Sequence, residues 1–236
     1  MLYINLSDTR QRQLSFYLAM EEYIARSYNC DECFFMWQVN PTVIFGRNQL
    51  IDNEVNLDYC SKHKIETYRR KSGGGCVYAD RNNVMLSYIT RDDNVEKTFD
   101  HYMGVVADAL STILGIDTVK TQNNDLLIGD AKVSGNAIYH LPGRIIAHGT
   151  LLYDTVMQNM ISAITPSKEK LQKHGVESVR QRITLLKDHT SMSLEEIKSR
   201  LRQHVCSSEH CLTLSDVAEI RKIEEEYLKP EFIYGK

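Results

Sequence analysis

The sequence lacks any long apolar run: none of its 236 residues belongs to a stretch near the roughly 18 apolar residues that cross a bilayer as a helix. Residues 1–5 lack the charged and apolar regions of a secretory signal peptide. The chain also lacks an excess of basic residues, because its formal net charge is −3. Nothing in this balance points to nucleic acid or an anionic membrane as partner. These absences predict a cytoplasmic protein in which any anion-binding site is local.

Cysteine and proline are both scarce, with six and four residues. Six cysteines in a chain of this length favour scattered reduced thiols over a disulfide framework. The alternative is a zinc site built from Cys30, Cys33, Cys206 and Cys211, since the first pair has a recognised ligand spacing. The second pair is spaced more loosely, and Cys33 opens an apolar run that predicts a strand. We therefore expect reduced structural cysteines.

No internal repeat, low-complexity tract or long linker divides the chain, so a single domain covering residues 1–236 is expected. Helical spacing of apolar residues predicts helices at residues 15–28, 56–63, 99–114, 167–174, 193–205 and 215–228. Short apolar or β-branched runs predict strands at residues 34–38, 42–45, 76–78, 84–89, 125–128, 132–139 and 145–152. Strands dominate the middle and helices flank it, so the predicted fold class is α+β with a mixed or antiparallel central sheet.

Turn and cap residues add detail to this prediction. The polar residues 80–83 are expected to join the strands at 76–78 and 84–89 as a pair, and hairpin turns are expected at 129–130 and 142–143. Gly115 is expected to end a helix, and Ser193 with Glu196 predicts a capping box. Residues 230–236 are expected to start a further strand.

Glycine is infrequent, yet three glycines are consecutive in the segment Arg69 to Gly75. Consecutive glycines cost backbone entropy, so a plain strand or helix would avoid them. They allow the main chain to approach a ligand closely, and Arg69 and Arg70 upstream can bind a carboxylate or phosphate through bidentate hydrogen bonds. The segment indicates an anion cradle, although a surface hairpin with a basic flank would look similar.

A second pattern begins at Asn124-Asp125 and continues to Ala137. Lys132 lies at the mouth of an apolar strand, where it can neutralise charge developing on a phosphate or carbonyl oxygen. Small residues follow it at Ser134, Gly135 and Ala137, which leaves room for a flat or elongated ligand. A strand that simply begins with a solvated lysine remains the alternative.

Two weaker patterns lie further along, at residues 148–152 and 178–184. The first places His148 at the start of a strand. The second places Arg180 and Arg182 on one face if the chain is extended there.

Together these segments resemble the lipoate–protein ligase family, within a larger group that includes biotin ligases and lipoyl or octanoyl transferases. The family's arginine–serine–triple-glycine loop matches Arg69, Arg70, Ser72, Gly73, Gly74 and Gly75. Its asparagine–aspartate and lysine–x–serine–glycine–x–alanine motif matches Asn124, Asp125, Lys132, Ser134, Gly135 and Ala137. Its histidine–glycine–threonine–leucine strand matches residues 148–151, and residues 37–49, 166–171 and 178–180 extend the resemblance to roughly residues 30–190.

The resemblance implies a biotin/lipoate ligase-like catalytic domain that activates lipoate with ATP and Mg²⁺ as lipoyl-AMP. The lipoyl group would pass to a lysine of lipoyl domains in 2-oxoacid dehydrogenase E2 subunits or of the glycine cleavage H protein. Lys132 would be the catalytic cation in both steps. Residues expected at lipoate or lipoyl-AMP are Arg70, Ser72, Gly73, Gly74, Gly75 and His148. Residues expected near the nucleotide are Asn124, Asp125, Ser134, Gly135 and Ala137, with Asp125 also the expected metal contact.

The chain departs from the family pattern in two respects. Ala79 stands where the family commonly has a histidine, so any role of that histidine does not transfer. The smaller C-terminal accessory domain of such ligases is expected to be absent, which implies either a separate partner protein or a ligase that works without one.

Three other functions compete with the ligase. An octanoyl or lipoyl transferase on the same fold needs a nucleophilic cysteine, and Cys76 is the only cysteine near the motifs. Biotin ligation is disfavoured by the lipoate-type form of the glycine loop. A non-catalytic lipoate-binding protein, or one subunit of a split ligase, would fit the expected loss of the accessory domain but would not need Lys132.

Overall fold

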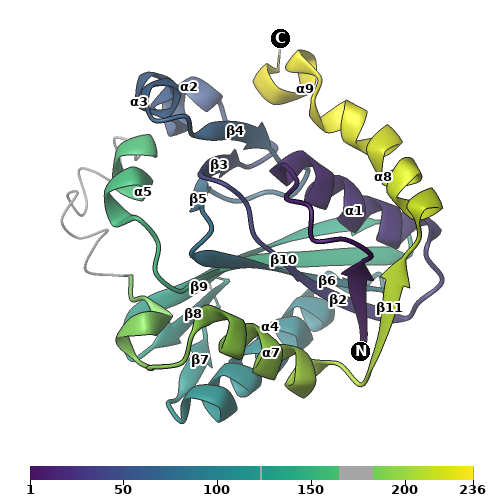
Figure 1. The fold of residues 1–236 in the computed structure, drawn as a ribbon, viewed down its shortest axis with the longest axis vertical. Helices are drawn as coiled ribbons and strands as arrows, with labels where there is room; N and C mark the ends of the chain where they lie inside the picture. The colour runs from purple at the N-terminus through teal and green to yellow at the C-terminus, as the bar shows by residue number, and fades with distance from the viewer. Residues whose placement is uncertain (123, 165–182, 236) are drawn as a thin grey trace.

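The computed structural model describes residues 1–122, 124–164 and 183–235, which form two β-sheets with helices packed around them (Figure 1). The large sheet has eight strands in the order β11-β1-β2-β6-β10-β9-β8-β7. Their bounds are β1 Leu2–Leu6, β2 Glu32–Trp37, β6 Asn83–Thr90, β7 Thr118–Lys120, β8 Asp125–Ile128, β9 Ala131–Leu141, β10 Arg144–Leu152 and β11 Ser208–Leu212. The small sheet has the order β4-β3-β5, with β3 at Thr42–Phe45, β4 at Glu66–Arg69 and β5 at Val77–Ala79. The strands from β11 to β2 pair in parallel and the rest of the large sheet is antiparallel, which confirms the mixed sheet of an α+β fold.

Four helices cover the two faces of the large sheet (Figure 1). Helices α1, Leu14–Ser27, and α8, Leu214–Tyr227, pack together on one face. Helices α4, Val95–Leu114, and α7, Leu194–Val205, cover the other. Shorter helical segments are α2 Ile51–Glu54, α3 Leu57–Lys62, α5 Met157–Ala163, η1 Leu186–Asp188 and α9 Pro230–Tyr234. Among the described helices, none is both long enough and apolar enough to cross a membrane.

Strand β6 explains why the sheet has a helix layer on each side, because all eight of its residues are buried. Met85 and Ile89 belong to the hydrophobic cluster that contains α1. Leu86 and Tyr88 alternate with them and belong to the cluster that contains α4. Burial of each such apolar side chain contributes about 1.5–3 kcal/mol relative to exposure, so a central strand without a polar face requires cover on both sides.

The helix ends follow the predicted cap residues. Ser193 and Glu196 form the expected capping box at the start of α7. Gly115 ends α4 with a φ of 68°, a left-handed conformation that glycine adopts without a Cβ penalty. Helix α4 begins at Val95, four residues before the predicted start, because the side chain of Asn94 caps it by accepting a hydrogen bond from the Lys97 N–H.

The predicted pairing of two strands is wrong. The strands at 76–78 and 84–89 exist as β5 and β6, but they do not pair: β5 pairs with β3, and β6 lies in the large sheet. Asp80 lies where the chain passes between the sheets and accepts hydrogen bonds from Asn82 N and Val156 N. These hydrogen bonds hold the chain where it passes from the small sheet to the large one, so residues 80–83 do not form a hairpin turn between β5 and β6. The neighbouring strands β2 and β3 are likewise in different sheets.

The strand expected at 230–236 is wrong, since Pro230 begins the short helix α9. Proline fits the first helical turn because its missing N–H would have no helical partner there. The helix predicted at 167–174 and the motifs at 166–171 and 178–180 lie outside the described residues. Strands β1, β4, β7 and β11 were not predicted.

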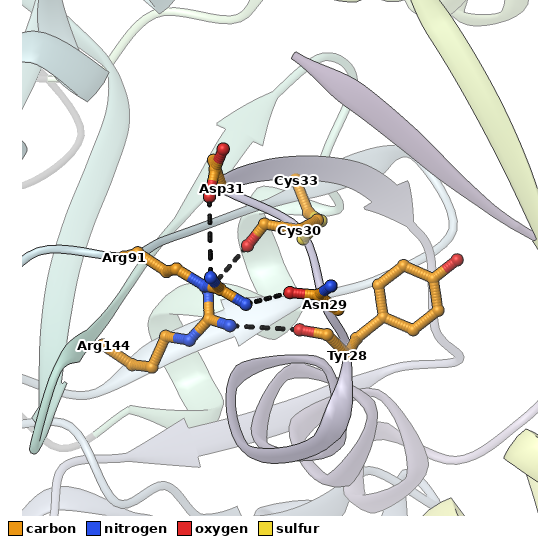
Figure 2. The surroundings of a disulfide bond; sticks show 7 residues. All are labelled: Tyr28, Asn29, Cys30, Asp31, Cys33, Arg91 and Arg144. Atoms are coloured by element: carbon orange, nitrogen blue, oxygen red, sulfur yellow. Dashed lines mark hydrogen bonds and ion pairs between the residues drawn. A yellow bond between two sulfur atoms is a disulfide. The ribbon is translucent and has the colours of Figure 1, made fainter.

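The cysteine prediction is wrong for one pair, because Cys30 and Cys33 form a disulfide bond (Figure 2). The intervening loop is fixed by Arg144, whose guanidinium donates hydrogen bonds to the carbonyl oxygens of Tyr28 and Cys30. The free cysteines are Cys60, Cys76, Cys206 and Cys211. In the described ranges no group of three or more His, Cys, Asp or Glu side chains is placed to hold a metal ion, and the disulfide engages two of the four considered zinc ligands.

Candidate active site

A cavity of about 350 Å³ lies between the two sheets and collects most of the predicted site residues. The large sheet contributes its floor, and the small sheet with the glycine loop contributes its roof. Predicted residues that line it are Arg70, Gly74, Gly75, Asn124, Asp125, Lys132, Gly135, Ala137 and His148. Apolar lining residues are Leu18, Trp37, Ile44, Val77 and Met85. The cavity therefore combines an apolar part with a charged part, as expected for a ligand with both characters.

Strand register builds the floor of this cavity. One row of directly paired residues runs across neighbouring strands from Trp37 through Met85, Thr150 and Gly135 to Asp125. Gly135 and Ala137 also line the cavity, and because they are small they leave space above the floor. A Cβ added at Gly135 would lie 2.7 Å from Lys132 Nζ, so a larger residue would displace that lysine.

Lys132 and Asp125 form an ion pair at the charged part of the cavity, with Nζ and Oδ1 2.7 Å apart. A bulge between β8 and β9 places them together, since the register shifts between Leu126 and Leu127. Asn124 has a φ of 68°, a left-handed conformation that asparagine tolerates, and this turn leads the chain into β8. Lys132 is thus held at the cavity by its pairing with Asp125.

The glycine loop approaches the backbone of the chain more closely than any side chain would permit. A Cβ added at Gly46 would lie 2.2 Å from the carbonyl oxygen of Gly74. Gly74 itself has a φ of 89°, outside the range that residues with a Cβ readily adopt. The loop therefore needs glycine at both positions in order to form the roof.

Arg70 holds the shape of this loop. Its guanidinium donates hydrogen bonds to the carbonyl oxygens of Gly73, Gly75 and Ile44 at 2.7–3.2 Å. It is 5% exposed, and burial lowers its pKa to about 10. Its expected contact with a ligand carboxylate remains a prediction, and the structure adds a role in fixing the loop.

The residues on either side of Arg70 tie the loop to the C-terminal helices. Arg69 Nε donates to the carbonyl oxygen of Ile233 at 3.0 Å. Lys71 Nζ donates to Glu22 on α1 and to Glu226 on α8, both at 2.8 Å. Burial disfavours the carboxylate of Glu22, but its hydrogen bonds with Lys71 and other donors outweigh this and hold its pKa below the ordinary value.

Three predicted site residues do not line the cavity: Ser72, Gly73 and Ser134. Ser72 is 1% exposed, and its Oγ lies 2.7 Å from His148 Nε2. Ser134 is buried, and its Oγ accepts a hydrogen bond from Asn136 Nδ2. Ser72 and Ser134 thus contact His148 and Asn136, which do line the cavity.

Comparison with known proteins matches residues 13–206 to the model of the lipoyl protein ligase A/B catalytic domain. The chain belongs to this family. It is 32% identical over 248 residues to lipoate-protein ligase LplJ of Bacillus subtilis, covering all of this chain and 74% of that protein. It is 33% identical to lipoate–protein ligase 1 of Staphylococcus aureus, covering 93% of this chain and 69% of that protein.

A solved structure agrees with this family assignment. The bi-partite lipoate protein ligase of Thermoplasma acidophilum superposes with a TM-score of 0.88 at 26% identity, covering 99% of this chain and 96% of that one. Relatives at about 30% identity over most of the chain are lipoate–protein ligases, so this member of the lipoyl ligase family is an enzyme of that type.

Several residues of this ligase cavity were missed from the sequence. Trp37 and Asn136 line it, and Asn136 binds the carbonyl oxygen of Asn124 and the hydroxyl of Tyr102. Glu21 contacts His148 from behind the wall. Glu21 lies seven residues after Leu14, so it falls on the apolar face of α1. A charged residue on an apolar face was the signal in the sequence that could have identified it.

Proposed function

We propose that this chain activates lipoate with ATP to form lipoyl-AMP and transfers the lipoyl group to a lysine of a lipoyl domain. The observation that carries the proposal is Lys132 at the charged part of a cavity whose other part is apolar. Lipoate is an apolar chain ending in a carboxylate, so its chain would lie along Trp37 and Leu18 with the carboxylate toward Lys132.

In the first step, a lipoate carboxylate oxygen attacks the α-phosphorus of ATP and pyrophosphate leaves. Two anions meet, so the step needs nearby positive charge, which Lys132 supplies. In the second step, the neutral amine of the acceptor lysine attacks the carbonyl carbon of lipoyl-AMP, the bond from that carbon to AMP breaks, and the amine loses a proton to water as the amide forms. Lys132 would stabilise the negative charge that develops on that carbonyl oxygen.

Mg²⁺ would enter with the nucleotide. This ion is usually held by one or two carboxylates together with substrate phosphates, and Asp125 is the carboxylate that lines the cavity. Such an ion would neutralise phosphate charge, and binding would release Lys132 from its pairing with Asp125. The residues thus fit a nucleotide-borne Mg²⁺ better than a site made by protein alone.

Purified protein with ATP, Mg²⁺ and lipoate tests the proposal directly. Pyrophosphate release with lipoate alone, followed by a mass gain on an added apo lipoyl domain, is the expected result. An absence of pyrophosphate under every combination of these reagents would refute the adenylation chemistry.

The same assay tests the partner requirement. The Thermoplasma relative is bi-partite and was analysed with its E2 lipoyl domain, which supports a lipoyl-domain acceptor here. We propose that residues 1–236 form a single catalytic domain. The assay decides whether a separate accessory protein is also required. Adenylation without transfer until such a protein is added would assign this chain to a split ligase; acceptors in E2 subunits and H protein can be compared in parallel.

Cys76 is the observation that keeps a thioester transferase in consideration, because it lines the cavity. Burial raises the pKa of its thiol to about 12, against a smaller lowering by Arg70. A thiol with that pKa remains protonated near neutral pH and is a poor nucleophile.

We therefore expect Cys76→Ser to retain ATP-dependent lipoylation. Iodoacetamide at pH 8 should modify the exposed Cys211 well before Cys76, as measured by peptide mass spectrometry. Rapid alkylation of Cys76, together with acyl transfer from a carrier thioester in the absence of ATP, would favour the transferase.

A further inference from the structure

Glu21 is a buried acid behind the wall of the cavity. It lies on α1, is 3% exposed and does not line the cavity. In the described part of the chain no lysine or arginine lies within ion-pair distance of it, and its Oε2 atom makes a hydrogen bond with Nδ1 of His148 at 2.9 Å. Burying a carboxylate without a permanent cation costs stability, so its contacts require an explanation.

The first contact leads to the glycine loop. A carboxylate accepts hydrogen bonds only, so the Nδ1 atom of His148 must be the donor to Glu21. The Nε2 atom then accepts the hydroxyl proton of Ser72 when the imidazole is neutral, at 2.7 Å. Ser72 directly precedes the three glycines, and its carbonyl oxygen accepts a hydrogen bond from Arg47 N.

The second contact leads to the apolar part of the cavity. Ser87 donates to the other carboxylate oxygen of Glu21 and accepts a hydrogen bond from Trp37 Nε1 at 2.8 Å. Ser87 and His148 are directly opposite each other on β6 and β10. A single carboxylate thus connects Trp37, His148 and the glycine loop, which form three parts of the cavity wall.

We propose that Glu21 is a positioning residue for ligation: it fixes the Nδ1–H tautomer of His148 and so places Ser72 and the glycine loop over the substrate carboxylate. This inference rests on the proposed function. The Ser72–His148–Glu21 geometry also matches that of a hydrolytic triad. Ser72, however, is almost fully buried and outside the cavity lining, so it positions the loop and does not attack the substrate.

Glu21→Gln tests the proposal, with Glu224→Gln as the matched control. Glu224 is also a buried glutamate that accepts a serine hydroxyl, that of Ser15, but its contacts do not lead to the cavity. Glu21→Gln should lower kcat/KM for pyrophosphate release by about tenfold to hundredfold, the range typical of lost positioning contacts. Glu224→Gln should retain it. The double variant Glu21→Gln/Ser72→Ala should lose no more activity than the worse single variant, because both changes break one pathway.

Histidine ¹⁵N NMR provides a readout that does not depend on activity. In the wild-type protein the resonance absent from His148→Asn should report a protonated Nδ1 and an unprotonated Nε2. The Nδ1–H signal should shift in Glu21→Gln and stay in place in Glu224→Gln. If the wild-type protein does not ligate lipoate, the proposed function is refuted. The NMR measurement still decides the tautomer of His148 in that case.

Four results would overturn the inference: an Nε2–H tautomer, unchanged kinetics in Glu21→Gln, additive losses in the double variant, or labelling of Ser72 by a fluorophosphonate. If Glu21→Gln does not fold, the tautomer of His148 in the wild-type protein still decides the role of Glu21, and the cycle of Ser72→Ala with His148→Asn tests the link from His148 to the glycine loop. Additive losses in that cycle would count against the proposal in the same way.

Discussion

Replacing Lys132 with alanine should abolish both half-reactions and leave the fold intact. Lys132 is a cation at the charged part of the cavity, and removal of an electrostatic group that acts in the transition state typically costs on the order of a hundredfold or more in rate. The lysine is partly exposed and its pairing with Asp125 is screened by water, so little stability should be lost. Pyrophosphate release and transfer from synthetic lipoyl-AMP, measured separately, check the two steps.

Lys120→Ala is the control for this variant. Lys120 is similarly exposed and pairs with Asp100, but it does not line the cavity. The Lys120→Ala variant should retain the activity and the melting temperature of the wild-type protein. A Lys132→Ala protein that forms lipoyl-AMP at the normal rate would remove Lys132 from the first step, and normal transfer would remove it from the second.

Replacing Arg70 with methionine should destabilise the protein by about 1–3 kcal/mol and abolish activity. The change leaves the buried carbonyl oxygen of Ile44 without this donor, and an unsatisfied buried group costs about 1–3 kcal/mol; the part-buried bonds to Gly73 and Gly75 are lost as well. The glycine loop would lose the contacts that keep it over the cavity. Equilibrium urea unfolding measures the first effect and pyrophosphate release the second.

Arg144→Met separates stability from function. Arg144 also donates to two loop carbonyls, those of Tyr28 and Cys30, but it lies outside the cavity lining. It should lose stability and keep its activity at temperatures where it is folded. If Arg70→Met were as active as Arg144→Met, the loop would not need its guanidinium clamp.

The sequence pattern predicted the helices and strands that depend on residues close together in the chain. Helix α4 could be found because Met103, Val106 and Leu110 recur at helical spacing, and all three are buried. Strand β11 could not, since four of its five residues are not buried and it exists because its backbone pairs with β1 at the opposite end of the chain. The assignment of β5 and β6 to different sheets depends on similar distant pairings.

The candidate site divides in the same way. The glycine loop and Lys132 lie in compact sequence motifs, so the sequence identified them. Glu21 was missed because its partner His148 is 127 residues away, and a charge on an amphipathic helix is ordinarily solvated. The disulfide of Cys30 and Cys33 depends on the folded loop around it, which spacing alone does not determine.

The attachments of Arg69 to Ile233 and of Lys71 to Glu226 make the roof of the cavity and the helices α8 and α9 parts of one thermodynamic unit. A ligand that orders the glycine loop strengthens these attachments, and linkage is reciprocal. We expect such a ligand to suppress local opening of the C-terminal helices. Conversely, any molecule that binds α8 or α9 and holds them closed raises the affinity of the distant cavity for its ligand.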